Sequence, residues 1–434
     1  MLDQNTDRMW YVIGAVLIGA AIIGGFMFFM PGAFSSVGGM FEDFIGIVNN
    51  DPDEEEIQDL IADGYIPVAT ADELNSIRND TPRIYGEGTK WEKEYTGGLG
   101  NKYVQVANVD LSGYSEEGWT PIGTVDEDWS IWSTSEMSTS FKGTYDGGNH
   151  VITGLEVKGE GERFKGLFGF AQGATIRNVG LIDNKVIGRE YVGGLLGGAN
   201  NNTTIINSHT TGSVEGTGTG RYAGSYVGGL MGRVWNSTVK NSYSTGSVIG
   251  KEQVGGLVGG AQSGTEISNS YATGSVEATS FKIGGLVGEA QSGAKISNSY
   301  ATGSVKSSGS VVGGLVGDAH NLTIENSYAI GPVTGGNNVG GFVGSVGNST
   351  ISNSYATGLV KGVNRVGGLV GLANSGSGFH ISNSYWDKES TGQEEPVEGG
   401  TGLTTNEMKN QATYEGWDFD TVWKIDGNDY PTLR

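Results

Sequence analysis

Val-Gly-Gly-Leu-Val-Gly occupies Val254–Gly259, and Ile-Ser-Asn-Ser-Tyr-Ala-Thr-Gly-Ser-Val follows at Ile267–Val276. The first phrase also occurs, intact or slightly varied, at Val192–Gly197, Val227–Gly232, Ile283–Gly288, Val312–Gly317, Val339–Gly344 and Val366–Gly371, with a degenerate copy at Lys165–Gly169. A unit that recurs at a fixed period cannot bury its apolar face alone and must stack on its neighbours. The repeat therefore predicts a solenoid.

The period and composition of the repeat favour strands over helices. The second glycine of each pair recurs about every 27–29 residues, with a loop insertion at Gly216–Ser225. Helical repeats are longer, and each glycine costs a helix about 1 kcal/mol. Short β-branched runs between glycines and Asn-Ser turns indicate strands instead. We therefore predict an all-β fold, a parallel β-helix of about eight coils of 27–29 residues.

Equivalent residues of successive coils should stack in columns about 4.8 Å apart. Within one coil we expect strands at Val254–Val258, at Ile267–Ala272 and from Ser275 onward. The leucine and isoleucine columns should be interior: Leu257, Leu286, Leu315 and Leu369, and Ile267, Ile296, Ile324, Ile351 and Ile381. The asparagine column forms either a side-chain amide ladder or solvated left-handed turns. Its members are Asn241, Asn269, Asn298, Asn326, Asn353 and Asn383.

With these phrases, the chain resembles the GLUG-motif repeat proteins of bacterial and archaeal surfaces. The flanks Trp119–Gly123, Phe141–His150 and Trp417–Phe419 resemble that family's entry and closing segments, so the resemblance covers about residues 65–434. It implies a scaffold found in adhesins, secreted enzymes and surface proteins. Some IgA-specific metallopeptidases carry such repeats beside a zinc domain, which no segment of this chain matches.

Tryptophans gather outside the repeats. Trp91, Trp119, Trp129 and Trp132 precede them, Trp386, Trp417 and Trp423 lie at or after the last one, and Trp235 is inside. The open ends of a solenoid must be covered, and large aromatic side chains suit that task. A carbohydrate-stacking platform is the alternative interpretation.

The N-terminal segment Met9–Met30 has no charged residue. A helix of this length spans a bilayer core. Arg8 precedes it and the next basic residue is Arg78, so residues 1–8 should be a cytoplasmic tip and the solenoid should lie outside the cell. A signal peptide cleaved near Ala33–Ser35 is the competing interpretation.

Small residues within the segment recur four apart, as Ala15 and Gly19, Ala20 and Gly24, and Ala21 and Gly25. Such faces let helices approach closely, so they are candidates for self-association. Phe34, Val37, Phe41, Phe44 and Val48 continue as an amphipathic stripe. This layout is also that of a pilin-like subunit whose helices form a filament core, although the bacterial pilin signature is missing.

The expected organisation is a tip (1–8), a transmembrane or assembly helix (9–30), an amphipathic helix and acidic linker (31–64), an N-terminal cap with the first coils (65–157), the repeat solenoid (158–387) and a C-terminal cap (388–434). Asn49–Asp63 carries a block of acidic residues typical of a solvated linker. Asp72–Arg78 should be a short helix capped by Asp72 or Thr70.

Composition and motifs argue against several classes of function. The net charge of −22 argues against nucleic-acid binding, and the absence of cysteine removes disulfides and thiolate sites. His-Glu-x-x-His and phosphate-binding loops are missing. Carboxylates for polysaccharide cleavage would be Asp126, Glu127 and Asp128, or Glu266, Glu289, Asp318 and Glu325, which we expect not to share one repeat position. We expect no enzyme and assign no catalytic, cofactor or metal residue.

Six asparagines fit the acceptor pattern Asn-x-Ser/Thr: Asn79, Asn201, Asn202, Asn236, Asn321 and Asn348. Such matches arise by chance in turns of this composition, and they matter where the host glycosylates its surface proteins. We predict a membrane-anchored, surface-displayed solenoid that acts as an adhesin or structural protein and contacts glycans or surface proteins. A filament subunit is the alternative and a polysaccharide-active enzyme the third.

Overall fold

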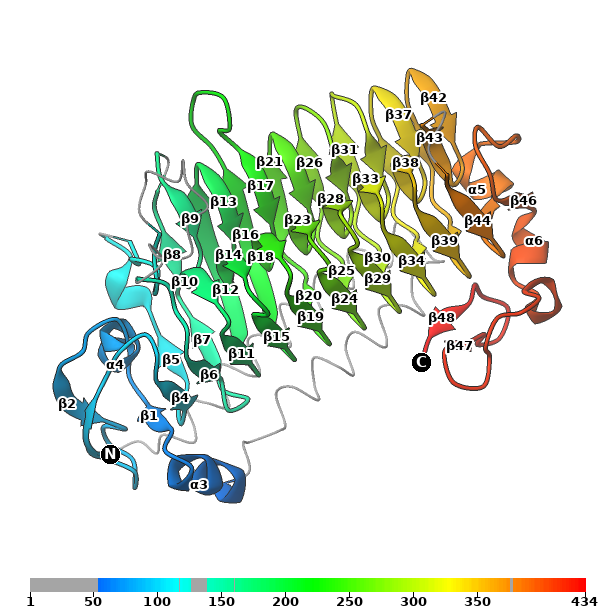
Figure 1. Cartoon of the computed structure of the whole chain (residues 1–434). Helices are drawn as coiled ribbons and strands as arrows, with labels where there is room; N and C mark the ends of the chain where they lie inside the picture. Colours follow the sequence, from blue (N-terminus) through cyan, green and yellow to red (C-terminus); the bar gives the residue numbers. More distant parts are fainter. Residues whose placement is uncertain (1–53, 117, 126–138, 160, 375–377) are drawn as a thin grey trace, which may run out of the picture. The chain divides into compact units, whose positions relative to one another are not determined.

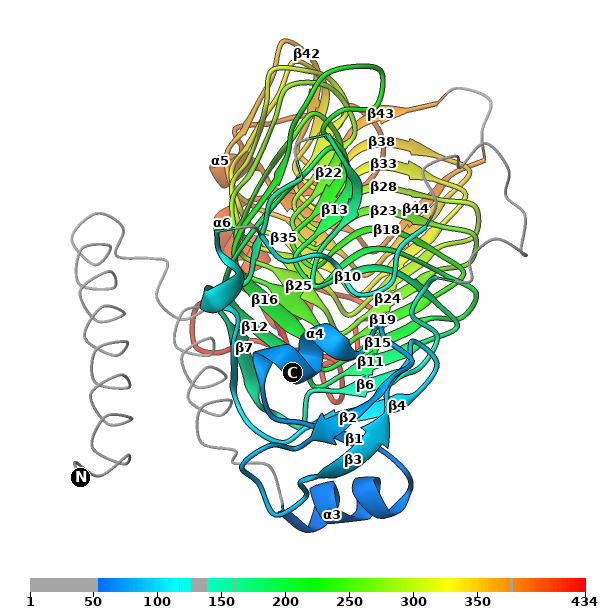
Figure 2. The ribbon, with the colours of Figure 1, turned by 90° about the vertical axis from the view of Figure 1, so that its left-hand side faces the viewer.

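The described part of the chain is an all-β parallel solenoid of about eight coils (Figure 1). The computed structural model describes residues 54–434, apart from 117, 126–138, 160 and 375–377. Every strand of the stack pairs in parallel with the equivalent strand of the next coil, and a view along the stack shows the coils overlying one another (Figure 2). Each coil passes through four faces, here numbered in chain order.

Faces 1 and 2 are single rows of strands. Face 1 contains β10 (Phe168–Gln172), β14 (Leu196–Asn200), β18 (Met231–Trp235), β23 (Val258–Gln262), β28 (Val287–Gln291), β33 (Val316–His320), β38 (Val343–Gly347) and β43 (Val370–Ala373). Face 2 contains β1 (Ile66–Val68), β4 (Lys102–Gln105), β6 (Thr144–Asp146), β11 (Thr175–Arg177), β15 (Thr204–Ile206), β19 (Thr238–Lys240), β24 (Glu266–Ser268), β29 (Lys295–Ser297), β34 (Thr323–Glu325), β39 (Thr350–Ser352) and β44 (His380–Ser382).

Face 3 consists of two rows that share the long strands β12 (Gly180–Gly188) and β16 (His209–Gly216). One row continues with β5 (Val109–Asp110), β7 (Val151–Thr153), β20 (Tyr243–Ser244), β25 (Tyr271–Ala272), β30 (Tyr300–Ala301), β35 (Tyr328–Ala329), β40 (Tyr355–Ala356), β45 (Tyr385–Asp387) and β46 (Thr401–Leu403). The other continues with β8 (Glu156–Val157), β21 (Ser247–Gly250), β26 (Val276–Ala278), β31 (Val305–Ser307), β36 (Val333–Thr334) and β41 (Val360–Lys361).

Face 4 returns the chain to face 1. It contains β9 (Arg163–Lys165), β13 (Glu190–Gly193), β17 (Ser225–Gly228), β22 (Glu252–Gly255), β27 (Ile283–Gly284), β32 (Val312–Gly313), β37 (Asn337–Gly340) and β42 (Asn364–Gly367). The insertion expected at Gly216–Ser225 is the loop between β16 and β17.

The phrase Val-Gly-Gly-Leu-Val-Gly turns a corner, so the expectation of one strand at Val254–Val258 is wrong. Val254 lies in β22 on face 4, and Val258 begins β23 on face 1. Coil-to-coil stacking brings backbones together at this corner: a Cβ added to Gly256 would lie 2.1 Å from the carbonyl oxygen of Gly285. Glycine therefore recurs at this corner because the backbones of successive coils lie too close together to leave room for a Cβ. Likewise, Ile267–Ala272 divides into β24 and β25 at an Asn-Ser corner.

The core is built from the predicted columns. Leu257, Leu286, Leu315 and Leu369 are at most 1% exposed, and so are Ile267, Ile296, Ile324 and Ile351. Ile381 is only partly buried, because β44 is the last strand of face 2 and has a neighbour on one side. In the first coils larger aromatic side chains fill the interior instead, among them Tyr103, Phe141 and Phe168.

The N-terminal end carries short helices and a hairpin. The capping box of Thr70 and Glu73 begins α4 (Ala71–Ser76), as the sequence predicted, and Leu74 is buried in the core. An antiparallel hairpin, β2 (Pro82–Tyr85) and β3 (Lys93–Thr96), and the 3-10 helix η1 (Ser112–Tyr114) follow. Part of the acidic block expected as a linker is instead the helix α3 (Glu54–Ala62), because its Ile57 packs against the apolar cluster of Tyr65 and Val104.

The C-terminal end is closed by Trp386 and the segment after it. Trp386 takes the place of the interior alanine of the preceding coil, Ala356, and its indole Nε1 donates to the carbonyl oxygen of Gln393. After α5 (Lys388–Thr391) the chain reaches β46, and the rest forms a lobe of α6 (Thr405–Met408), η2 (Gln411–Thr413) and the hairpin β47 (Trp423–Lys424) with β48 (Thr432–Leu433).

The expected apolar helix at Met9–Met30, its small-residue faces (Ala15, Gly19, Ala20, Gly24, Ala21 and Gly25) and the stripe from Phe34 to Val48 lie outside the described residues. Within the described part of Glu54–Arg434, no helix combines the length and apolarity needed to cross a membrane.

Candidate functional site

The outer surface of face 2 is a flat, half-exposed array of polar side chains. From β11 onward each three-residue strand points its middle residue inward and its outer two residues to the surface, as Val239 and its neighbours Thr238 and Lys240 show. One outward column holds Thr144, Thr175, Thr204, Thr238, Glu266, Lys295, Thr323, Thr350 and His380 in register. Threonine thus dominates this column.

The second outward column of face 2 varies more. It holds Arg177, Ile206, Lys240, Ser268, Ser297, Glu325, Ser352 and Ser382. Lys295 and Glu325 form an ion pair at 2.7 Å across the two columns, with side chains 45% and 34% exposed. A pair this exposed adds little stability. Face 2 therefore offers hydroxyl groups and scattered charges over an interior column of isoleucine and valine.

A ladder of asparagine amides borders face 2. In each coil the asparagine before the recurring serine has a positive φ, such as 49° at Asn269. In most coils its Nδ2 donates to Oδ1 of the asparagine one coil earlier, but Oδ1 of Asn298 has no hydrogen-bond partner among the described residues, so the ladder is interrupted between Asn298 and Asn326. The Nδ2–Oδ1 distances are 3.1–3.3 Å, from Asn207 to Asn178, Asn241 to Asn207, Asn269 to Asn241, Asn298 to Asn269 and Asn353 to Asn326. Both interpretations of this column are correct, because the left-handed turn is what brings the amides into line.

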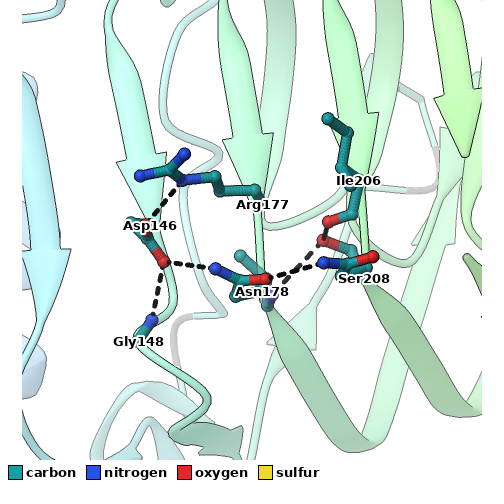
Figure 3. Close-up of polar contacts among 8 residues, drawn as sticks. Asp146, Gly148, Arg177, Asn178, Ile206 and Ser208 are labelled. Atoms are coloured by element: carbon teal, nitrogen blue, oxygen red, sulfur yellow. Dashed lines mark hydrogen bonds and ion pairs between the residues drawn. The ribbon is translucent and has the colours of Figure 1, made fainter. Parts of the chain in front are cut away.

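The ladder begins at a carboxylate. Asp146 lies in register with Arg177, one residue before the asparagine position, and its Oδ1 accepts hydrogen bonds from Nδ2 of Asn178 at 2.9 Å and from the backbone N–H of Gly148 (Figure 3). Its Oδ2 accepts from Nε of Arg177 at 2.6 Å. The amides from Asn207 to Asn298 donate toward this end, so a buried negative charge there complements their aligned dipoles.

The serine after each asparagine links neighbouring coils. Ser208 Oγ donates to the carbonyl of Ile206 at 2.9 Å (Figure 3) and accepts the backbone N–H of Val179 at 3.2 Å. The same pair of bonds recurs at Ser242, Ser270, Ser299, Ser327, Ser354 and Ser384, where Oγ accepts the N–H of the serine one coil earlier. These hydroxyls satisfy N–H groups where the strands break at the corner. The sequence analysis missed this role.

The tyrosines of the second phrase stack along face 3. Neighbouring ring centroids lie 4.6–5.2 Å apart with interplanar angles of 2–11° from Tyr243 through Tyr271, Tyr300 and Tyr328 to Tyr355. His209 occupies the tyrosine position one coil earlier and stacks on Tyr243 at 4.8 Å. Burial lowers the pKa of His209 to about 4. This row presents ring edges, because each face is covered by the next ring.

The C-terminal lobe covers the end of this row. Trp417, Trp423 and Met408 pack with Tyr328 and Tyr355 in one buried cluster. The Tyr355 hydroxyl donates to the carbonyl of Pro431 at 2.7 Å. Trp119, Trp235 and Trp386 are at most 6% exposed as well, and Trp91 is half-buried. The described tryptophans thus present no exposed ring face suited to sugar stacking, while Trp129 and Trp132 lie outside the described residues.

A third feature covers face 1. The residue before each Val-Gly-Gly has a positive φ, and the side chains of Phe164, Tyr226 and Lys282 lie over outward residues of face 1. Tyr226 thus lies over Gly260, and the guanidinium of Arg233 sits 4.1 Å from the ring centroid of Tyr226 and 4.4 Å from that of Trp235. Arg233 also donates to Oε1 of Gln262 at 2.7 Å. These partners hold the guanidinium within the protein, while its Nε has no hydrogen-bond partner in the described part of the chain.

Two of the carboxylates singled out in the sequence lie beside this cluster. The four carboxylates do not share one repeat position, but two of them do: Glu289 and Asp318 are in register on β28 and β33. Both directly follow the last glycine of the repeat phrase, a signal that was available in the sequence. Lys282 lies between them, with its Nζ on Oε1 of Glu289 and 3.2 Å from Oδ2 of Asp318.

Glu289 and Asp318 share the single amine of Lys282. Burial lowers the pKa of Lys282, but Glu289 and Asp318 outweigh burial and leave it raised, so the amine stays protonated. Glu266 and Glu325 are on face 2, and the structure does not bring them into this group. Asp126, Glu127 and Asp128 lie outside the described residues.

The GLUG motif is found four times in the chain, at residues 223–249, 250–277, 280–306 and 335–361. These matches confirm the repeats that the resemblance predicted. Sequence relatives include a Gly-rich membrane protein of Evansella cellulosilytica, 43% identical over 12% of this chain, and halomucin of Haloquadratum walsbyi, 37% identical over 38%. The matches span 6% and 1% of those proteins, respectively.

A third relative is named immunoglobulin A1 protease, from Streptococcus sanguinis, and is 32% identical over 27% of this chain and 6% of its own length. A solved structure named for an immunoglobulin A1 protease of Bacteroides ovatus has a TM-score of 0.43 and 19% identity, and the match covers 85% of this chain and 91% of that one. The expectation of no enzyme is therefore corrected, since one of the sequence relatives is named as a protease. The aligned share of the Streptococcus protein is too small to carry its activity to this chain.

Proposed function

We propose that the protein is a surface-displayed solenoid that acts in adhesion or cell-surface interaction, with the outer surface of face 2 as its contact surface. One observation carries the proposal. The interior column of face 2 is isoleucine or valine from Ile176 to Ile381, while the outward columns change between hydroxyl, acidic and basic side chains. Stacking alone does not require that variation.

The chemistry of face 2 favours a polar, uncharged polymer such as a glycan. Its threonine and serine hydroxyls donate and accept hydrogen bonds along a rigid line of strands. The net charge of −22 disfavours polyanions. The names of two relatives, a Gly-rich membrane protein and halomucin, support a place at the cell surface.

Attachment to the membrane is part of the same proposal, through Met9–Met30. Carbonate extraction of membranes from cells that make the full chain would leave the protein in the membrane fraction. Release into the soluble fraction would remove the anchor from the proposal while leaving the contact surface untouched.

Binding can be tested with the purified full-length protein on a panel of immobilised glycans. Lysines at Thr204 and Thr238 put charge in the centre of face 2 and should weaken binding at least tenfold. Matched lysines at Ser275 and Ser304, which are exposed on face 3, should leave it unchanged. Equal binding by both variants, or binding to no glycan and no surface protein, would refute face 2 as the contact surface.

A further inference from the structure

A second column of asparagines lies at the turn that enters face 2. Asn202, Asn236, Asn321 and Asn348 are exposed and have φ of 64°, 43°, 56° and 48°. They precede β15, β19, β34 and β39 by two residues. This column is distinct from the amide ladder at the far edge of the same face.

Each of these asparagines has a threonine two residues later, in the outward column of face 2. The residue between them points inward and is at most 5% exposed: Thr203, Ser237, Leu322 and Ser349. The asparagine amide and the threonine hydroxyl are therefore both on the surface. In the two coils between the pairs the turn holds Ser263 and Ser292, and the outward position holds glutamate or lysine. In these two coils asparagine and threonine are both absent from these positions, whereas Thr144 and Thr175 occur without an asparagine two residues earlier.

The other asparagine column shows that this pairing is not a consequence of composition. From Asn207 onward its asparagines are followed directly by serine, and then by tyrosine or histidine at the second position, and Asn178 is followed by valine and glycine, so none fits Asn-x-Ser/Thr. Asn201 does fit, but its partner Thr203 is fully buried and donates its hydroxyl to the carbonyl of Asn200 at 2.7 Å.

The acceptors lie in two pairs, and within each pair the positions are not equivalent. Nδ2 of Asn236 donates to Oδ1 of Asn202 at 3.1 Å, and Nδ2 of Asn348 donates to Oδ1 of Asn321 at 3.1 Å. These hydrogen bonds therefore engage the amide nitrogen of only the second asparagine in each pair, Asn236 or Asn348. Neighbouring coils are about 4.8 Å apart, so two glycans on one pair would collide.

We infer that Asn202 and Asn321 are N-glycosylation sites, each carrying one glycan beside face 2. Nδ2 bonds to the anomeric carbon of an oligosaccharide that the host supplies on a lipid diphosphate. The bond from that carbon to the diphosphate oxygen breaks, the lipid diphosphate leaves with the electron pair, and the amide gives up one proton. This inference rests on the proposed location at the cell surface.

The test uses the protein purified from the cells that naturally make it, with glycopeptide mapping by mass spectrometry. We expect a glycan on Asn202 and Asn321 and bare asparagine at Asn236 and Asn348. Thr204→Ser keeps the acceptor pattern and should keep the glycan at Asn202. Thr204→Val removes the pattern with little change of shape and should abolish it, while Asn321 stays modified as an internal control.

Protease treatment of intact cells separates this inference from the proposed function. Cleavage of the protein from the outside, together with unmodified Asn202 and Asn321, would overturn the glycosylation sites and leave the surface role standing. Glycans on Asn236 and Asn348 in their place would also overturn the inference. Protection of the protein from added protease would overturn both.

Discussion

Replacing His209 with tyrosine tests how the stacked row on face 3 responds to pH. His209 is 8% exposed and stacks on Tyr243 with an interplanar angle of 9°. Burial lowers its pKa from 6.5 to about 4, so the folded protein holds the neutral imidazole over a range in which the unfolded chain binds a proton. The folded pKa lies below the unfolded one, and this histidine's contribution is therefore greatest above pH 6.5.

The size of the effect follows from the two pKa values. Between pH 6.5 and about 4 the contribution falls by about 1.4 kcal/mol for each pH unit, about 3 kcal/mol in all. In His209→Tyr this contribution to the pH dependence disappears. The free energy of unfolding of the variant minus that of the parent should therefore rise by about 3 kcal/mol as the pH is lowered over this range.

Guanidinium unfolding followed by circular dichroism, from about pH 7.5 to about pH 4, measures that difference, because all other titrating groups are common to both proteins. His209→Phe is the matched control, since it removes the titration without adding a hydroxyl, and it should show the same pH trend. A difference between parent and variant that stays constant across the range would refute the assignment of a buried neutral histidine.

Three further perturbations test the core, a backbone position and the amide ladder. Leu286→Ala removes a fully buried member of the leucine column and should cost about 2–5 kcal/mol in urea unfolding, while Ser304→Ala on the surface should change little. Val311 has a φ of 63°, which is unfavourable for a β-branched residue, so Val311→Asn should stabilise by about 1 kcal/mol and Val311→Ala should not. An unchanged or lower melting temperature for Val311→Asn would count against strain there. Asp146→Asn puts a donor where three donors now point at a carboxylate and should cost about 1.5–3 kcal/mol in the same unfolding assay.

The fold could be predicted from the sequence because the spacing of the repeated phrases gives the number of residues in one coil. The interior leucines and isoleucines follow directly from stacking, and so do the asparagines of the ladder. The corner at Gly255–Leu257 was misplaced because a glycine pair fits both a strand bend and a turn, and the distance between coils decides between them.

The parts that could not be predicted do not repeat. The lobe that covers Tyr328 and Tyr355 depends on Trp417 and Trp423. The positions of these tryptophans in the sequence indicated only that an end of the solenoid must be covered. The left-handed residue before each Val-Gly-Gly varies from Tyr226 to Lys282 to Val311, so side-chain type gives no sign of its backbone conformation. The registry of Glu289 with Asp318 was visible in the spacing, but their shared lysine was not.

The cover over face 1 makes the coils distinguishable although their backbones are nearly alike. Tyr226 lies beside Arg233 of its own coil and over Gly260 of the next, and Lys282 joins Glu289 of its own coil to Asp318 of the next. Exchanging two coils would keep the composition and the glycine corners. It would, however, place an aromatic ring against a carboxylate or leave a lysine without its ion-pair partner. Side chains outside the stacking core therefore make the order of the coils specific. The stability of a variant with exchanged coils, compared with that of the parent, would measure how much these side chains contribute.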